Sequence, residues 1–247
     1  MVRLNSSADL ENLRKEIISK VDPKKPAVTL CISTGCEALG AKDVLKAFKE
    51  EFKKQGLEGK IDIKETGCLG FCEKGPRVVV YPEGIAYFKV QASDVPEIVS
   101  KTVLNKEIVE RLLYADPNTG KKAKVLSDVP FYKYQYRLLM DNNAKVDPQK
   151  IEDYIALDGY KALSKVLFQM SPDQVMEEVK KSQLRGRGGG GFPTFQKWDS
   201  TRKAHEDPKY VIVNCDEGDP GAFMNRALME GNPHSILEGL IIAAYAV

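Results

Sequence analysis

The stretch Ala27-Val-Thr-Leu-Cys31-Ile-Ser-Thr-Gly-Cys36 decides how the first part of this chain folds. Residues 27–33 are mostly apolar or β-branched, which predicts a short buried strand. A loop through Gly35 follows, and residues 41–55 then repeat apolar side chains with helical spacing. A strand that leads through a loop into a helix begins an α/β unit, and this loop carries two cysteines.

The neighbouring segments extend that unit in both directions. Two more strand-like runs are joined by Pro82-Glu83-Gly84, which predicts a hairpin. The expected order is a helix at 8–20, strands at 27–33 and 61–65, the hairpin at 78–81 and 85–90, and a closing helix at 94–103. The sequence therefore predicts a compact α/β domain over residues 1–104.

Four cysteines follow the first two predicted strands. Cys31 and Cys36 have four residues between them, and Cys68 and Cys72 have three. The two loops can meet at one end of the sheet, and four thiols that stay reduced indicate a metal site. Zinc modules use tighter cysteine pairs, so the wider spacing favours an iron–sulfur cluster. Structural zinc and unliganded buried cysteines are the alternatives.

The composition excludes several classes of function. The net charge is +2 with 29% charged residues, which gives no case for nucleic-acid binding. No apolar run is long enough to span a membrane, and the N-terminus does not resemble a signal peptide. We therefore expect a cytoplasmic protein whose five cysteines are not paired in disulfides.

The second half begins with a lysine-rich junction and continues as a mostly helical region. Ser171 followed by Pro172 is a strong helix start, with an N-cap residue and a proline in the first turn. The expected helices are 131–141, 147–156, 159–169, 171–182 and 194–204, followed by a short buried strand at 210–214.

A glycine-rich stretch lies between two of these helices: Leu184-Arg-Gly-Arg-Gly-Gly-Gly-Gly-Phe-Pro-Thr194. Backbone N–H groups that lead into a helix N-terminus, beside Arg187 and Lys197, suit a phosphate group. The stretch follows a helical pattern and lacks the P-loop ending, so neither common nucleotide-binding motif explains it. A flexible linker is the alternative.

These motifs together resemble one family. The cysteine spacing is similar to that of thioredoxin-like 2Fe–2S ferredoxin domains. The glycine stretch and Asn214-Cys-Asp-Glu-Gly-Asp-Pro-Gly-Ala-Phe223 resemble segments of the FMN-binding, NADH-oxidising subunits of complex I and of NAD(P)-linked iron hydrogenases. The implied fold is α/β: a ferredoxin domain at 1–104, a helical linker at 105–170, and the first part of a Rossmann-like FMN-binding domain at 171–247.

The resemblance also implies roles for single residues. It implies that FMN is held by Gly186, Arg187, Gly188, Gly189, Lys197, Asn214, Asp216 and Glu217. It places Phe192 and Asp219 near NAD(H) or NADP(H), and the 2Fe–2S cluster on Cys31, Cys36, Cys68 and Cys72. The family's 4Fe–4S ligands would lie beyond Val247. The last stretch reads as a helix without a C-cap, so we expect the chain to be a fragment.

The implied function is oxidation of NAD(P)H by FMN, with electrons passing one at a time to iron–sulfur clusters and on to partner subunits. No side chain is required as an acid or base, so no catalytic residue is predicted. A 2Fe–2S electron carrier with an inactive flavin segment is the rival hypothesis, and a zinc-stabilised scaffold is a third.

Overall fold

The computed structural model describes residues 3–247, which divide into two compact units. The sheet unit consists of Val21–Asp153 with Gly221–Asn232, and the helical unit of residues 3–20, Tyr154–Pro220 and Pro233–Val247. Each unit thus combines segments far apart in the sequence. The domain limits expected above, 1–104, 105–170 and 171–247, follow the chain and stay a prediction.

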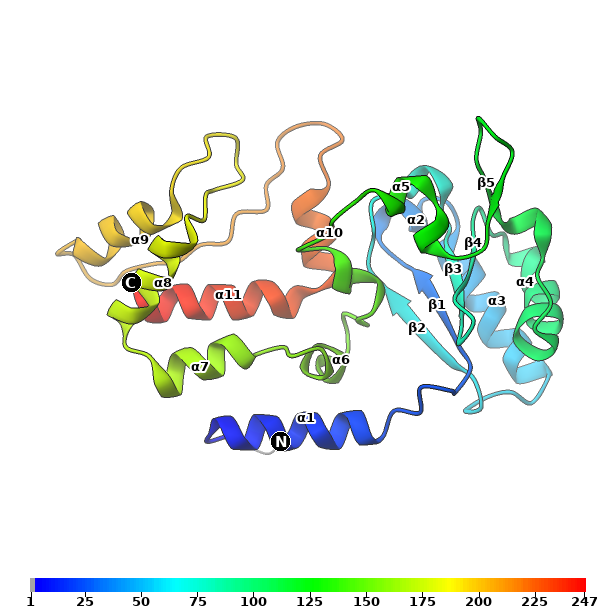
Figure 1. The fold of residues 1–247 in the computed structure, drawn as a ribbon, viewed down its shortest axis with the longest axis horizontal. Coiled ribbons are helices and arrows are strands. Elements are labelled where there is room, and N and C mark those ends of the chain that lie inside the picture. The colour runs from blue at the N-terminus through cyan, green and yellow to red at the C-terminus, as the bar shows by residue number, and fades with distance from the viewer. Residues whose placement is uncertain (1–2) are drawn as a thin grey trace. The chain divides into compact units, whose positions relative to one another are not determined.

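The sheet unit is built on four strands in the order β2-β1-β3-β4 (Figure 1). The strands are β1 Ala27–Cys31, β2 Asp62–Thr66, β3 Val78–Tyr81 and β4 Ile85–Tyr87. Strand β1 runs parallel to β2 and antiparallel to β3, and β3 pairs with β4 as the expected hairpin. Because β1 and β2 are parallel, the loops after both strands leave the same end of the sheet.

Helices cover one face of this sheet, where α3 packs against β1 and α4 (Figure 1). The elements are α2 Thr34–Glu37, α3 Ala41–Lys54, η2 Ala92–Asp94, α4 Val95–Glu97 and η3 Ile98–Leu104. Val28, Phe48, Tyr87 and Ile98 are fully buried between the layers. Burying each large apolar side chain contributes roughly 1.5–3 kcal/mol, which explains why the layers pack here.

An aromatic layer covers the other face. Along β3, Val78 and Val80 face the helices while Val79 faces this layer, as strand alternation requires. Phe71 stacks on Phe131 with ring centroids 4.3 Å apart. The layer also includes η4 Glu110–Leu112, β5 Tyr114–Ala115, β6 Lys122–Ala123, η5 Leu126–Asp128, α5 Pro130–Lys133 and η6 Asp141–Ala144.

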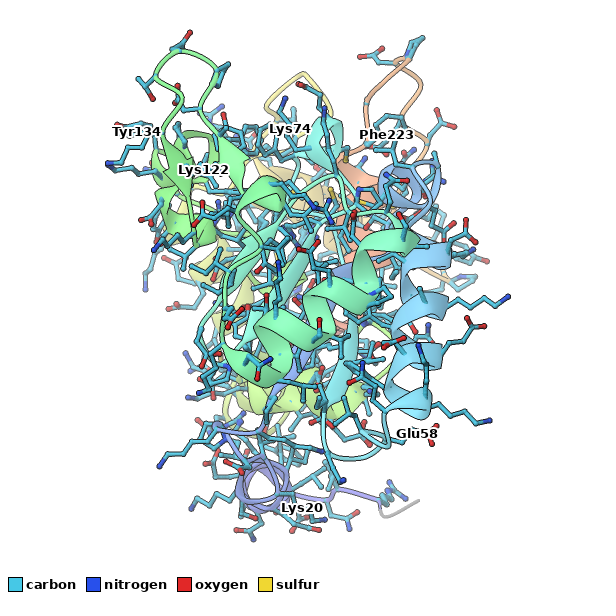
Figure 2. All side chains as sticks on the ribbon, turned by 90° about the vertical axis from the view of Figure 1, so that its right-hand side faces the viewer. Lys20, Glu58, Lys74, Lys122, Tyr134 and Phe223 are labelled. Atoms are coloured by element: carbon cyan, nitrogen blue, oxygen red, sulfur yellow. The ribbon has the colours of Figure 1, made fainter. Side chains whose placement is uncertain are left out.

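The helix expected at 131–141 is wrong. Helix α5 ends at Lys133, and the chain runs without regular structure to Met140. Tyr134, Tyr136 and Leu138 are strongly exposed, and Figure 2 shows Tyr134 at the edge of the unit. An amphipathic pattern becomes a stable helix only when its apolar face is buried, and this segment has no surface to bury it against.

The helical unit packs α11 against α7, α8 and α9, and α1 against α7. The bounds are α1 Ser7–Ser19, α6 Ile151–Ala156, α7 Lys161–Gln169, α8 Pro172–Ser182, α9 Thr194–Lys203 and α11 Pro233–Ala246. Helix α8 starts as expected, because the Ser171 hydroxyl accepts from Gln174 N and the Gln174 side chain accepts from Ser171 N. Helix α6 starts four residues later than the expected 147.

The short strand expected at 210–214 is also wrong. Tyr210 and Ile212 are 73% and 82% exposed, and the described residues 205–220 form no helix or strand. A lone strand leaves its amide groups unpaired, and all six strands of residues 3–247 lie in the sheet unit. None of the helices in residues 3–247 is long and apolar enough to cross a membrane.

Candidate functional site

Four thiols gather at the end of the sheet where β1 and β2 finish. Cys31 is the last residue of β1 and Cys36 lies in α2. Cys68 follows β2 by two residues, and Cys72 begins η1 Cys72–Lys74. Cys31, Cys36 and Cys68 are buried, and Cys72 is half-buried. The parallel pairing of β1 with β2 is what brings together two cysteine pairs that are distant in sequence.

The thiols lie close together. The sulfurs of Cys68 and Cys72 are 3.4 Å apart, and Cys31 lies near Cys36 and Cys68. The contact with Cys36 lowers the pKa of Cys31, whereas the contacts with Cys31 raise the pKa of Cys36 and of Cys68. The backbone N–H of Gly70 donates to the sulfur of Cys68 over 3.1 Å. Protons are thus shared among crowded sulfurs.

Two glycines leave the space that the sulfurs need. A Cβ atom on Gly35 would lie 3.0 Å from the sulfur of Cys72, and one on Gly75 would lie 2.8 Å from that of Cys36. Contacts this short are avoided by real side chains, so any larger residue would displace a sulfur. The glycines therefore keep the cavity around the sulfurs open.

The spacing of two of the sulfurs suits thiolates that share a metal. Within residues 3–247, no three Cys, His, Asp or Glu side chains are arranged to hold a metal ion as they stand. Two thiolates bonded at about 2.3 Å to one tetrahedral metal have their sulfurs about 3.8 Å apart. The 3.4 Å contact between Cys68 and Cys72 is close to that spacing. A set of four thiols without oxygen ligands fits iron–sulfur chemistry.

Helix α10, Met224–Gly231, packs beside the thiols. A cavity of about 250 Å³ separates them, lined by Ser33, Thr34, Gly35, Ala38, Cys68, Cys72, Phe223, Arg226, Ala227 and Glu230. The hydroxyl of Thr34 donates to Glu230 Oε1 over 2.7 Å, and Thr34 N–H donates to Glu230 Oε2 over 3.3 Å. Arg226 Nε donates to Glu230 Oε1 over 2.8 Å. Partial burial alone would raise the pKa of Glu230, but these bonds together lower it.

A second set of contacts holds the C-terminal half of α10. The side-chain amide of Asn143 donates to the backbone oxygens of Cys68 and Ala227, over 3.1 and 2.8 Å. Gly67 approaches Gly231 so closely that a Cβ atom on Gly67 would clash with the Cα of Gly231. Helix α10 directly follows Phe223, the last residue of the predicted flavin segment. Figure 2 shows Phe223 and Lys74 at the same end of the sheet unit.

Sequence reasoning missed Arg77, a buried cation beside the thiols. Arg77 is 6% exposed, and its backbone oxygen accepts from Cys31 N–H over 3.3 Å. Its side chain hydrogen-bonds to the hydroxyl of Tyr132, but its Nε atom has no partner within residues 3–247. Burial alone would lower its pKa, yet Tyr132 and Cys31 together raise it. The only signal in the sequence is a charged residue directly before the apolar run 78–80.

The glycine stretch forms a closed, exposed loop ahead of α9. Gly186 N–H donates to the oxygen of Phe192 over 2.8 Å, and Thr194 N–H donates to that of Leu184 over 2.9 Å. Gly189 and Gly191 have φ angles of +103° and +57°, which favour glycine. Among residues 3–247, the N–H groups of Gly188 to Gly190 have no protein acceptor, and a Cβ atom there would meet open space. These amides are therefore left without a protein acceptor and face open space.

The other residues that the resemblance implies for FMN and nucleotide are also accessible. Arg187, Lys197, Asn214, Asp216 and Asp219 are exposed. Phe192 is 52% exposed, and Glu217 is half-buried in a left-handed conformation with φ +49°. The side-chain oxygen of Asn214 accepts from Asp216 N–H over 3.0 Å, which shapes the turn. Trp198 packs with Val175 and Met176, so its role is in the core.

Comparison with known proteins gives two family matches. Residues 16–103 match the family described as thioredoxin-like [2Fe-2S] ferredoxin, and residues 179–247 match the Nuo51 FMN-binding domain. All four gathered thiols lie in the first match. The glycine loop and the segment 214–223 lie in the second.

Several individual proteins are similar to parts of the chain. The NADP-reducing hydrogenase subunit HndC of Solidesulfovibrio fructosivorans is 50% identical over 115 residues, 47% of this chain and 23% of that protein. The NAD-reducing hydrogenase HoxS subunit alpha of Cupriavidus necator is 27% identical over 90% of this chain and 35% of that protein. The chain thus spans about a quarter to a third of these relatives.

A solved structure is similar to part of the chain. The thioredoxin-like [2Fe-2S] ferredoxin from Aquifex aeolicus is 36% identical, with 36% of this chain and 89% of that chain covered and a TM-score of 0.34.

Proposed function

Because this chain belongs to the family in which a thioredoxin-like 2Fe–2S ferredoxin domain is joined to a Nuo51-type FMN-binding domain, we propose that it takes part in oxidation of NAD(P)H. The observation that carries the proposal is the convergence of four thiols at one end of the sheet. The chain spans only part of its relatives, so the activity belongs to a longer protein or to an assembly.

The cluster ligands in this proposal are Cys31, Cys36, Cys68 and Cys72. Their side chains already lie close together, Gly35 and Gly75 leave them room, and the N–H of Gly70 donates to the sulfur of Cys68. When bound, a 2Fe–2S cluster accepts single electrons, whereas FMN converts a two-electron hydride into single electrons. The residues of this chain hold and orient these groups, and none is needed to transfer a proton.

The flavin contacts in this proposal come from two exposed segments. Gly186, Gly188 and Gly189 present backbone to the FMN phosphate, with Arg187 and Lys197 supplying positive charge. Asn214, Asp216 and Glu217 supply polar contacts to the ribityl chain and ring, while Phe192 and Asp219 face the nicotinamide nucleotide. The unbonded loop amides support the first half of this assignment. Further iron–sulfur subunits are the proposed electron acceptors.

A second function, that of an electron carrier and docking module, also has an observation in its favour. The thiols are buried and gathered, whereas the residues proposed for FMN are exposed and the segment 205–220 lies in no sheet. In this case the chain would hold a cluster and bind no flavin tightly.

One measurement separates the two functions. The chain is purified without oxygen, and iron, acid-labile sulfide and FMN are quantified on one sample beside its visible spectrum. Two irons and two sulfides with one FMN per chain support the oxidoreductase. Cluster without flavin supports the carrier for the chain as it stands, and zinc without sulfide contradicts both. A Cys215→Ala variant should retain the full cluster, since Cys215 lies outside the gathered thiols.

A further inference from the structure

The guanidinium of Arg77 is a buried charge without a carboxylate partner in the part of the chain described. Arg77 is 6% exposed, and among residues 3–247 it forms no ion pair with a carboxylate. Its Nε atom donates to nothing in the part of the chain described. A buried charge without a partner costs several kcal/mol in a folded protein, so this position calls for an anion.

The surroundings of Arg77 show where that anion belongs. Leu30 pairs with Val78 in the antiparallel register of β1 and β3, so Arg77 lies opposite Cys31, and its backbone oxygen accepts from Cys31 N–H over 3.3 Å. Opposite residues of paired strands carry their side chains on the same face of the sheet. The neighbouring cation Arg137 sits 5.3 Å from the ring of Tyr132 and pairs with the carboxylate of Asp141, at 3.9 Å. Within the described residues, the gathered thiols are therefore the groups beside Arg77 that can take up negative charge.

A 2Fe–2S cluster on these thiols would place negative charge beside Arg77. Two ferric ions, two sulfides and four thiolates sum to two negative charges, and the entering electron makes three. A fixed cation nearby stabilises the more negative form more strongly, since the attraction grows with the charge. Burial strengthens this attraction because little water screens it.

We propose that Arg77 is the charge partner of the cluster, and that it raises the reduction potential by stabilising the added electron. Tyr132 positions the guanidinium through the hydrogen bond between them. This inference rests on the proposed ligation of the cluster by the four cysteines. It adds Arg77 as a residue that changes the reduction potential without binding the metal. Arg77 is thus a positioning and tuning residue rather than a ligand.

The test compares variants of the full chain loaded with iron and sulfide. Arg77→Met removes the charge and keeps an apolar stem of similar length, and Arg77→Lys keeps the charge. Lys60→Gln is the control, since it removes one exposed positive charge near Glu58, which Figure 2 shows at the opposite end of the unit from Lys74. The potential is measured by titration with dithionite and mediators, monitored by electron paramagnetic resonance.

At one fixed potential, we expect Arg77→Met to lower the ratio of reduced to oxidised cluster at least about tenfold. For a one-electron couple this corresponds to a reduction potential lower by about 59 mV. Arg77→Lys should restore most of that ratio, and Lys60→Gln should leave it within about twofold, because an exposed charge is screened. A Met variant with full iron content and an unchanged ratio overturns the proposal for Arg77 without touching the ligand assignment. A wild-type chain without iron and sulfide overturns the ligation itself.

Thermal unfolding and iron content serve as second readouts if a variant does not assemble the cluster. Without iron, Arg77→Met should unfold at a higher temperature than the unloaded wild type, because it removes a buried charge that has no carboxylate partner in the described chain. If the Met variant folds but does not assemble a cluster while the Lys variant does, the charge is required and the proposal stands. If the Met and Lys variants both fail to assemble one, Arg77 has a packing role and the proposal is wrong.

Discussion

At the scale of single residues, the proposed cluster site depends on all four cysteines lying at one end of the sheet. No single cysteine defines it. Cys31 lies near Cys36 and Cys68, and the sulfurs of Cys68 and Cys72 are 3.4 Å apart. Two distant loops supply two sulfurs each, so the site exists only when the sheet has formed. Its chemistry is therefore tied to folding of the sheet unit.

Cysteine variants test this arrangement. Cys68→Ala should remove a ligand from the centre of the group and reduce bound iron and sulfide to less than about half of the wild-type content, because each proposed ligand is needed to hold the cluster. The readout is iron and sulfide per chain with the visible spectrum. Cys215→Ala is the matched control, and an unchanged cluster in the Cys68→Ala chain would remove Cys68 from the ligand set.

A buried carboxylate plays a similar organising role in the helical unit. Glu238 of α11 accepts from the hydroxyl of Tyr154 over 2.6 Å, from Tyr160 N–H over 2.8 Å and from Leu163 N–H over 2.9 Å. Burial, followed by this bond to Glu238, raises the pKa of Tyr154. One side chain thereby ties α11 to the start of α7.

Removing that carboxylate should destabilise the helical unit. We expect Glu238→Leu to lower the free energy of unfolding by about 2–4 kcal/mol, because buried donors lose a charged acceptor. Glu178→Gln, at an exposed position of α8, should change it by less than about 0.5 kcal/mol. Urea unfolding followed by circular dichroism measures both, and equal effects would contradict the role of Glu238.

At the scale of elements, the start of helix α8 can be tested by a single substitution. Ser171 caps α8 in a reciprocal pair with Gln174. Ser171→Ala should cost about 1 kcal/mol of stability, since an N-terminal amide loses its acceptor. Ser200→Ala, within exposed α9, is the control and should be neutral. Thermal unfolding of the two variants side by side makes the comparison.

The docking of α10 depends on the ionised carboxylate of Glu230. Its pKa lies below the usual 4.5, so its contribution is fully present above that value and is lost as the pH falls through the lower folded-state pKa. Hydrogen exchange should show α10 amides protected near pH 7 and less protected once the pH falls through the lowered pKa of Glu230. Glu230→Gln should reduce protection at neutral pH and remove this pH dependence. Equal protection of both chains at every pH would contradict this role of Glu230.

At the scale of the whole molecule, the two units should respond differently to loading with iron and sulfide. All four thiols lie in the sheet unit, so binding stabilises that unit by mass action and leaves the other unaffected. Exchange of β1 and β2 amides should slow at least about tenfold on loading, while amides of α7 and α11 change less than about twofold. Equal slowing in both units would mean that they fold as one cooperative body.

Most elements of the fold were predictable because local pattern and burial agree there. The amphipathic helix at 41–55, the hairpin around Pro82-Glu83-Gly84 and the capped start at Ser171 all appear as expected. The expectations at 131–141 and 210–214 are wrong because the apolar side chains beyond α5 and those of the second segment stay exposed: Tyr134, Tyr136, Leu138, Leu139, Tyr210, Ile212 and Val213. The periodicity of a sequence shows which side chains could form an apolar face. A stable helix or strand forms only when that face packs against another surface of the protein.

The sequence by itself determined the cysteine pairs, the strands whose ends bring them together and the resemblance to flavin and iron–sulfur subunits, because these follow from spacing and local propensity. Tertiary structure alone placed Arg77 in the interior and α10 beside Cys68 and Cys72. An arginine between Pro76 and Val78 looks like any surface cation, and Thr34 and Glu230 are 196 residues apart. Burial and long-range contact belong to the folded chain, since neither leaves a local pattern in the sequence.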